Sequence, residues 1–199
     1  MPTQAERRAS TRRALLDAAA AVLVDHGTAG FTTTAVTARA ELSNGALFGH
    51  FPSRLDLLAA TVEHVLVRLR DDYDRTFAGL ERTPEPSTAL ELLWSAMSDE
   101  QFAAVLELYT QARTDVELLT AIHPVVAEHG EYVRGLVDRV ASVLGGADDA
   151  TRRRLAEIGN LAILAMQGVV VGRMAGAATG AERDLLDLCT RLADREIRS

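Results

Sequence analysis

Residues 43–51 combine helix-like apolar spacing with groups suited to a close polar contact. Asn44 and His50 carry an amide and an imidazole, both able to hydrogen-bond to another molecule. Gly45 and Gly49 are four residues apart, so on a helix they share one face and would let the backbone approach a partner closely. The stretch therefore predicts a short helix with one small, polar face, which a DNA major groove is wide enough to admit.

The surrounding sequence predicts the elements that must position this helix. An apolar stripe at helical spacing indicates a first helix over 10–26, with Gly27 as its C-terminal cap. Short helices follow over 33–40 and 44–51, and a long helix follows over 54–77. Two short helices joined by a tight turn behind a longer one form a helix-turn-helix. On spacing alone, the alternative is a helical hairpin inside an ordinary bundle.

The rest of the chain also has helical spacing, without sustained strand-like alternation. The clearest break is the proline-containing stretch 81–89, which we expect to be an interhelical loop. Pro124 is predicted to begin a helix and Gly145 with Gly146 to end the same one. The expected further helices are 88–97, 99–113, 115–122, 124–144, 151–176 and 181–197. The predicted fold class is all-α.

The 199-residue chain has a net charge of −7, no lysine and one cysteine. Residues 1–70 sum to +2 and the remainder to −9. This excludes a generally basic nucleic-acid coat, whereas a slightly basic N-terminal end could approach DNA. The polar N-terminus, the lone cysteine and the absence of an apolar run of ~20 residues predict a cytoplasmic protein with no membrane partner.

Other chemistry-bearing residues give no catalytic or metal signal. His123 and His129 are six residues apart, which is not the spacing that places two imidazoles on one helix face. No Ser/His/Asp arrangement and no glycine-rich phosphate loop rises above chance. We therefore predict no catalytic residue, no metal and no cofactor, in a protein that is not an enzyme. Cys189 is interpreted as a structural residue, with a redox switch as the alternative.

Residues 12–58 resemble the DNA-binding domain of the TetR family of bacterial transcriptional regulators. The matching segments, in fixed order, are AAAAVLVDHG, FTTTAV, AELSNG, LFGHF and PSRLDLL. Three positions depart from the family pattern. Glu41 stands where the family prefers glycine, Phe48 where it has tyrosine, and Arg54 where it has lysine. Phe48 lacks a hydroxyl that often reaches a phosphate in relatives, whereas Arg54 keeps a phosphate contact plausible.

The resemblance implies a helix-turn-helix DNA-binding domain over 1–53 and a ligand-binding and dimerisation domain over 54–199, connected by the helix 54–77. Asn44 has the only amide able to pair with adenine in the recognition helix. The predicted DNA-binding residues are Thr32, Thr33, Thr34, Ser43, Asn44, Gly45, Ala46, Phe48, Gly49, His50 and Arg54. Either a DNA-contacting arm or a frayed terminus is expected at Arg7, Arg8, Arg12 and Arg13.

The body is expected to bind a small, apolar effector and to form a homodimer. The candidate effector residues are Trp94, Met97, Phe102, Leu106, Tyr109 and Arg113, with plain core as the alternative reading. The candidate dimer residues are Ile163, Met166, Val170, Leu185, Leu188 and Leu192, with a central core helix as the alternative. The predicted function is a ligand-released repressor that binds a palindromic, double-stranded operator. The alternative is a helical ligand-binding or interaction protein that has lost specific DNA reading.

Overall fold

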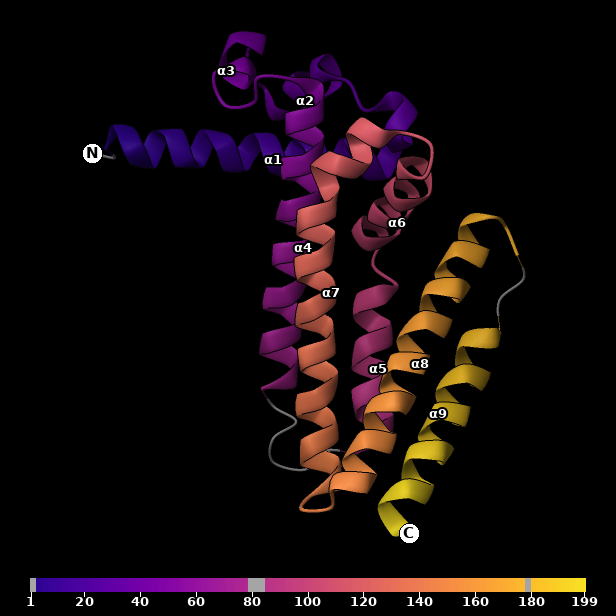
Figure 1. Cartoon of the computed structure of the whole chain (residues 1–199). Coiled ribbons are helices and arrows are strands. Elements are labelled where there is room, and N and C mark those ends of the chain that lie inside the picture. Colours follow the sequence, from indigo (N-terminus) through magenta and orange to yellow (C-terminus); the bar gives the residue numbers. More distant parts are fainter. Residues whose placement is uncertain (1–2, 79–84, 178–179) are drawn as a thin grey trace. The chain divides into compact units, whose positions relative to one another are not determined.

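The computed structural model describes residues 3–78, 85–177 and 180–199, and within these ranges every regular element is a helix (Figure 1). The predicted loop at 81–89 therefore lies partly outside the described residues. The helices are α1 (Gln4–Gly30), α2 (Thr33–Ala40), α3 (Asn44–Phe48), α4 (Arg54–Phe77), α5 (Pro86–Met97), α6 (Glu100–Ala112), α7 (Val116–Gly145), α8 (Asp149–Met174) and α9 (Ala181–Arg198).

The chain divides into two compact units. Unit 1 contains α1, α2, α3 and α6, with α4 up to Arg68 and α7 up to Val126. Unit 2 contains α5, α8 and α9, together with the remaining parts of α4 and α7. The expected division between functions after residue 53 stays a prediction.

The first helix begins earlier than the sequence analysis predicted. Thr3 and Glu6 form a capping box, in which the Glu6 N–H donates to Thr3 Oγ1 (3.2 Å) and the Thr3 N–H donates to Glu6 Oε2 (2.6 Å). This cap starts α1 at Gln4, so the segment is helical and not frayed, while contact between its arginines and DNA stays a prediction. Gly27 interrupts the helix with a left-handed φ of 59°, where the sequence predicted the helix end.

The helix-turn-helix is built as its sequence predicts. Thr32 caps α2 by accepting from the Ala35 N–H (3.1 Å), and Ser43 caps α3 by accepting from the Ala46 N–H (3.1 Å). Glu41 ends α2 with φ 55°, the left-handed conformation that glycine adopts more easily. Leu47, fully buried, holds α3 against the unit. The predicted all-α class, with this motif followed by a helical body, is confirmed.

One long helix replaces two predicted ones. Pro124 lies inside α7, which continues from Val116 to Gly145. Proline removes only its own N–H from the hydrogen-bond ladder, and the surrounding helix here continues past that loss. The prediction that Pro124 begins a helix was therefore wrong, while the predicted end at the two glycines is confirmed.

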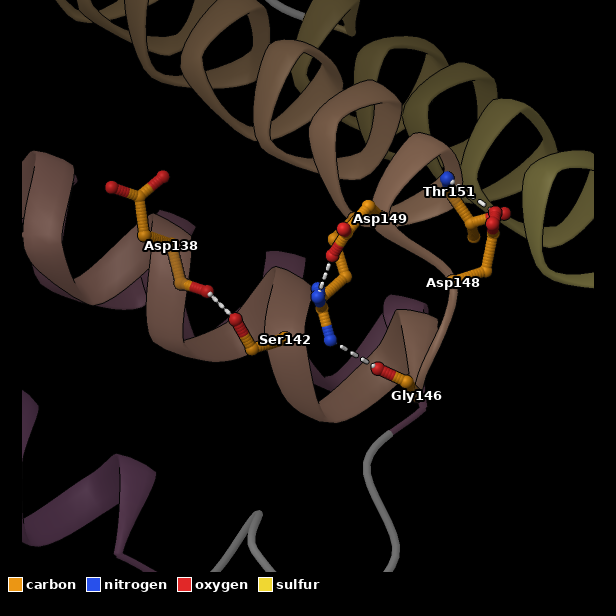
Figure 2. A network of polar contacts seen from close by, with 7 residues as sticks. Asp138, Ser142, Gly146, Asp148, Asp149 and Thr151 are labelled. Carbon is orange, nitrogen blue, oxygen red and sulfur yellow. Dashed lines mark hydrogen bonds and ion pairs between the residues drawn. The ribbon is translucent and has the colours of Figure 1, made fainter.

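The connection between α7 and α8 shows why both glycines are needed (Figure 2). A Cβ on Gly145 would lie 2.9 Å from Arg152 Cγ, and Gly146 has a φ of 57°. Arg152 donates to the Gly146 carbonyl (2.8 Å) and pairs with Asp149. Asp148 caps α8 by accepting from the Thr151 N–H (2.7 Å), and hydrogen bonds from the side chain and the backbone of Thr151 lower the pKa of the Asp148 carboxyl. The close approach and the cap together fix the start of α8.

Helices α8 and α9 lie side by side in unit 2 (Figure 1). Among the described residues, α8 is the one helix long and apolar enough to cross a membrane by length and composition alone. Helices in the cores of soluble proteins meet the same criterion. Since Ala162 and Met166 of α8 are fully buried within the chain, one side of the helix has a protein core as its environment.

Candidate functional site

The outer surface of the helix-turn-helix carries the predicted DNA-binding residues. Ser43, Asn44, Gly45, Phe48 and Gly49 are exposed on or beside α3. The remaining positions divide by exposure. Thr32, Thr34 and Arg54 are exposed, and Thr33, Ala46 and His50 are half-buried. Unit 1 therefore brings the predicted set together, with the side chain of Phe48 51% exposed at the end of α3.

Gly45 has no structural requirement for glycine. Its φ is not in the left-handed region, and a Cβ built on it would have Ser43 Oγ, 3.8 Å away, as its nearest neighbour. A larger residue would fit the folded chain and favour the helix by roughly 1 kcal/mol. The bare backbone at this point is therefore open to a molecule outside the chain.

A buried threonine positions the amide of the recognition helix. The Thr37 hydroxyl lies 3.2 Å from Asn44 Oδ1, and also within reach of the Thr33 (3.0 Å) and Thr34 (3.2 Å) carbonyls. One hydroxyl proton serves one acceptor at a time, while the amide oxygen keeps a second lone pair. Thr37 links the two helices of the motif, a role that sequence analysis missed. A threonine in the interior of α2 was the available signal.

Positive charge gathers at the C-terminal end of α3. Arg8 on α1 donates from Nη2 to the Gly49 carbonyl (3.3 Å), and the Arg12 guanidinium lies 5.4 Å from the centroid of the Phe51 ring. Partial burial, followed by the charges of Arg8 and Arg12, lowers the pKa of the half-buried His50 imidazole. The Thr3–Glu6 capping pattern was the signal that could have placed both arginines on a helix.

Arg54 supports the end of α1. Its Nε donates to the Phe31 carbonyl (2.8 Å) and its Nη2 donates to the Thr28 carbonyl (2.9 Å), with the guanidinium 5.8 Å from the Phe31 ring centroid. These bonds fix the chain between α1 and α2. The predicted contact between Arg54 and phosphate stays a prediction.

Glu107 on α6 provides a hydrogen-bond acceptor for the Thr28 N–H, which follows the interruption of α1 at Gly27. Its Oε1 accepts from the Thr28 N–H (3.3 Å) and from the Thr28 hydroxyl (3.1 Å). Gln111, one turn further along α6, donates to the same hydroxyl and to Glu107 Oε1 (3.3 Å). Helix α6 is thereby joined by polar bonds to the helix that carries Arg8 and Arg12.

The predicted effector residues do not come together within one unit. Trp94 and Met97 lie on α5 in unit 2. The other four belong to unit 1: Phe102, Leu106, Tyr109 and Arg113. Phe102 and Leu106 are buried, burial raises the pKa of the Tyr109 hydroxyl to about 12, and Arg113 is exposed.

Unit 2 contains a cavity of about 230 Å³ that includes one predicted residue, Met97. Its walls are mostly apolar, and its polar side chains come from Tyr73, His129, Arg134, Asn160 and Gln167. His129 is 7% exposed, and burial together with the charge of Arg70 lowers the pKa of its imidazole to about 4. The imidazole is therefore neutral at neutral pH. Sequence analysis missed these polar residues because they come from three different helices.

The outward face of α8 differs from the predicted dimer face. Met166 and Val170 are 0% and 4% exposed, so they pack inside the chain, and Ile163 lines the cavity. On α9, Leu188 is exposed as predicted, and Leu185 and Leu192 are half-buried. The exposed apolar residues of α8 are Leu161, Leu164, Val171 and Met174. The sequence could not select this face because α8 is apolar around most of its circumference.

Three comparisons identify the family. Residues 15–61 match the model of the bacterial regulatory proteins of the tetR family. An HTH-type transcriptional regulator of Mycobacterium tuberculosis is 33% identical over 147 residues, which covers 73% of each chain. The HTH-type transcriptional regulator CymR of Pseudomonas putida is 35% identical over 134 residues, covering 66% of this chain and 64% of CymR.

Solved structures share the fold at low sequence identity. A TetR-family regulator from Mesorhizobium loti superposes with a TM-score of 0.71 at 14% identity, over 96% of this chain and 95% of its own. The multidrug binding protein EbrR, complexed with imidazole, gives a TM-score of 0.61 at 22% identity over 91% of this chain and 93% of its own. With the matched helix-turn-helix and the relatives above, these results show that the chain belongs to the TetR family of bacterial transcriptional regulators, as a DNA-binding protein and not an enzyme.

Proposed function

We propose that the protein is a cytoplasmic homodimer that binds two half-sites of a palindromic operator and represses transcription until a small effector binds in unit 2. The observation that carries the DNA-binding part is Gly45, whose open backbone lies on an exposed face and has no structural need for glycine. A groove-entering helix needs such a place where its backbone comes near the bases.

The recognition surface suits two kinds of contact with DNA. Asn44, positioned by Thr37, offers an amide for one base edge, and the exposed Phe48 offers apolar surface to a thymine methyl or a sugar. Because so few side chains can read bases directly, the shape of the DNA would carry part of the specificity. A symmetric dimer would place two copies of α3 about 34–36 Å apart, one helical turn of DNA.

The cavity of unit 2 suits a mostly apolar effector that also carries polar groups. Its polar lining consists of a phenol, two amides, an imidazole that is neutral at pH 7 and the guanidinium of Arg134. EbrR, which shares the fold, has been crystallised with imidazole and with proflavin. An effector shifts DNA binding only if it binds one conformation more tightly than the other. Helices α4 and α7 contribute to both units, so a change of conformation in unit 2 can be transmitted through them to unit 1.

Footprinting on the DNA upstream of the gene at two salt concentrations tests this proposal. A sequence-selective footprint that weakens steeply with salt is expected, because phosphate contacts release counterions. No footprint in any flanking DNA would favour the alternative, a helical binding protein that no longer reads DNA.

Two amide variants separate the sites. Asn44→Ala should cost ~1–3 kcal/mol at one base position and leave effector binding unchanged. The matched variant Asn160→Ala should alter effector binding and leave base preference unchanged, because Asn160 lines the cavity. Equal base preferences in the wild type and in Asn44→Ala would remove Asn44 from the recognition surface.

A further inference from the structure

The C-terminal end of α3 carries positive charge that the chain does not neutralise. The three acidic residues of α1 have other partners. Glu6 accepts from the Thr3 N–H, Asp17 pairs with His64 and Arg68, and Asp25 pairs with Arg39. Within the described ranges, no ion pair involves Arg8 or Arg12. Two guanidinium groups thus stand beside the recognition helix with their charge available to an anion.

Three side chains converge at this point. Arg8 uses one of its five N–H donors on the Gly49 carbonyl, which leaves the others for a ligand. Arg12 covers the Phe51 ring, and the rings of His50 and Phe51 lie 6.2 Å apart between their centroids. Figure 1 shows the N-terminal part of α1 passing below α3, within the same unit.

We propose that Arg8, Arg12 and His50 form one site for a DNA phosphate, and that the bound phosphate holds His50 protonated, so that DNA binding takes up a proton. This inference rests on the proposed DNA-binding function. The resemblance already implies that His50 and these arginines contact DNA; the inference adds that the three share one phosphate and that the contact depends on pH.

The charged groups around His50 support the direction of the effect. Arg8 and Arg12 of α1 face the imidazole, and α3 contributes no charged side chain. On α4, Arg54 is bonded to the Thr28 and Phe31 carbonyls, and Asp56 accepts from Ser53 Oγ (2.8 Å).

A phosphate reverses the local balance of charge. In the free protein partial burial, followed by the charges of Arg8 and Arg12, lowers the pKa of His50 and so favours the neutral ring. A phosphate between the three groups offsets the arginine charges and accepts a hydrogen bond from the charged ring, which raises the pKa in the complex. A higher pKa in the complex than in the free protein means that binding becomes tighter as pH falls.

The test measures duplex affinity by fluorescence anisotropy at constant ionic strength while pH is lowered. Between about pH 8 and pH 6 the wild-type dissociation constant should fall by roughly threefold or more, because the phosphate-bound ring takes up a proton at a higher pH than the free ring. His50→Gln should bind with an affinity that is flat over the same range. His123→Gln, a matched change at an exposed histidine of α7, should keep the wild-type dependence.

Arginine variants test the shared phosphate. Arg8→Gln and Arg12→Gln should each weaken binding at every pH and lower the slope of log K against log salt by about one per protomer. Arg153→Gln, a matched change at an exposed arginine of α8 in unit 2, should keep that slope. An unchanged pH dependence in His50→Gln, or equal slopes in the three arginine variants, would overturn the inference.

The experiment also separates this inference from the proposed function. Phosphate contacts do not depend on sequence, so an arbitrary duplex serves as the probe. A normal pH response on such a duplex without any sequence-selective footprint would overturn the operator-binding proposal and support the phosphate site. Failure to bind any duplex would overturn both.

Discussion

Two positions of unit 1 are occupied by glycine for different physical reasons. Gly27 has a φ of 59°, and a Cβ there would lie 3.1 Å from Glu107 Oε1, so the fold itself requires glycine. Gly45 has ordinary helical geometry and open space around it. A substitution at Gly45 therefore acts on whatever approaches α3 from outside and leaves the fold intact.

Gly45→Ala should raise the free energy of unfolding by up to ~1 kcal/mol, because alanine favours a helix. The same variant should weaken operator binding by roughly tenfold, because a methyl group occupies the point of closest approach. Urea unfolding and a DNA-binding titration measure the two effects. Gly135→Ala on α7, where the nearest atom is 3.8 Å away, should gain stability without losing DNA affinity. A parallel loss of affinity in both variants would argue against a contact at Gly45.

His129 makes the stability of the protein depend on pH. Its pKa is lowered to about 4 by burial and by Arg70, whereas in the unfolded chain it is near 6.5. Below pH 6.5 the unfolded state therefore binds a proton that the folded state does not. The free energy of unfolding decreases as the pH is lowered from 6.5 to about 4. The full difference amounts to ~3 kcal/mol.

His129→Gln should show a shallower loss of unfolding free energy between pH 6.5 and pH 4, measured by urea denaturation at a series of pH values. The exposed His123→Gln is the control and should lose stability as steeply as the wild type. Identical slopes in all three proteins would mean that another group dominates the acid response.

Among the elements, α6 and α1 depend on one polar junction. Gly27 interrupts the regular helical hydrogen bonding of α1. The next residue, Thr28, is 7% exposed, and its N–H donates to Glu107. A buried donor that loses its partner costs the folded state its full desolvation penalty. The hydrogen bonds between Glu107 and Thr28 therefore couple the stability of α6 to that of α1, in the unit that carries the helix-turn-helix.

Glu107→Ala should lower the free energy of unfolding by ~1–3 kcal/mol, because the Thr28 N–H and hydroxyl lose their acceptor. Glu63→Ala, an exposed change in the interior of α4, should cost less than ~0.5 kcal/mol. Chemical denaturation of both variants gives the comparison. Equal costs would show that solvent replaces the carboxylate without penalty.

The elements also show what the sequence could predict. Caps and glycines are local signals, so the bounds of α2 and α4 and the end of α7 at its glycines were close to those observed, whereas α3 ends at Phe48, before the predicted end at residue 51. Pro124 was misread because neighbouring turns of one helix compensate for a missing N–H. The recognition surface was found through its motif, whereas the cavity and the Glu107 junction depend on tertiary contacts between distant segments.

At the scale of the whole molecule, α8 carries a stripe of apolar side chains that a single chain leaves exposed to solvent. Leu161 and Leu164 are 56% and 67% exposed, and Val171 and Met174 extend the same side of the helix. With Leu188 of α9 they form an apolar surface that a second copy could cover.

Leu161→Glu should weaken the dimer by ~2–4 kcal/mol, because two carboxylates would be buried at the interface. Analytical ultracentrifugation measures the dissociation constant. Leu119→Glu, at a leucine of α7 in unit 1 that is 45% exposed, should leave the dimer intact. A dimer that survives Leu161→Glu would place the interface elsewhere.

The chain has a single tryptophan, and Trp94 lies on α5 in unit 2. Its emission therefore reports on one unit alone, whereas far-ultraviolet circular dichroism reports on helices of both. If the two units unfold as one, the two signals change at the same denaturant concentration. If DNA stabilises unit 1 alone, only the dichroism transition should shift when duplex is added, with the fluorescence transition unchanged. A built-in optical probe thus distinguishes a cooperative regulator from two independently melting halves.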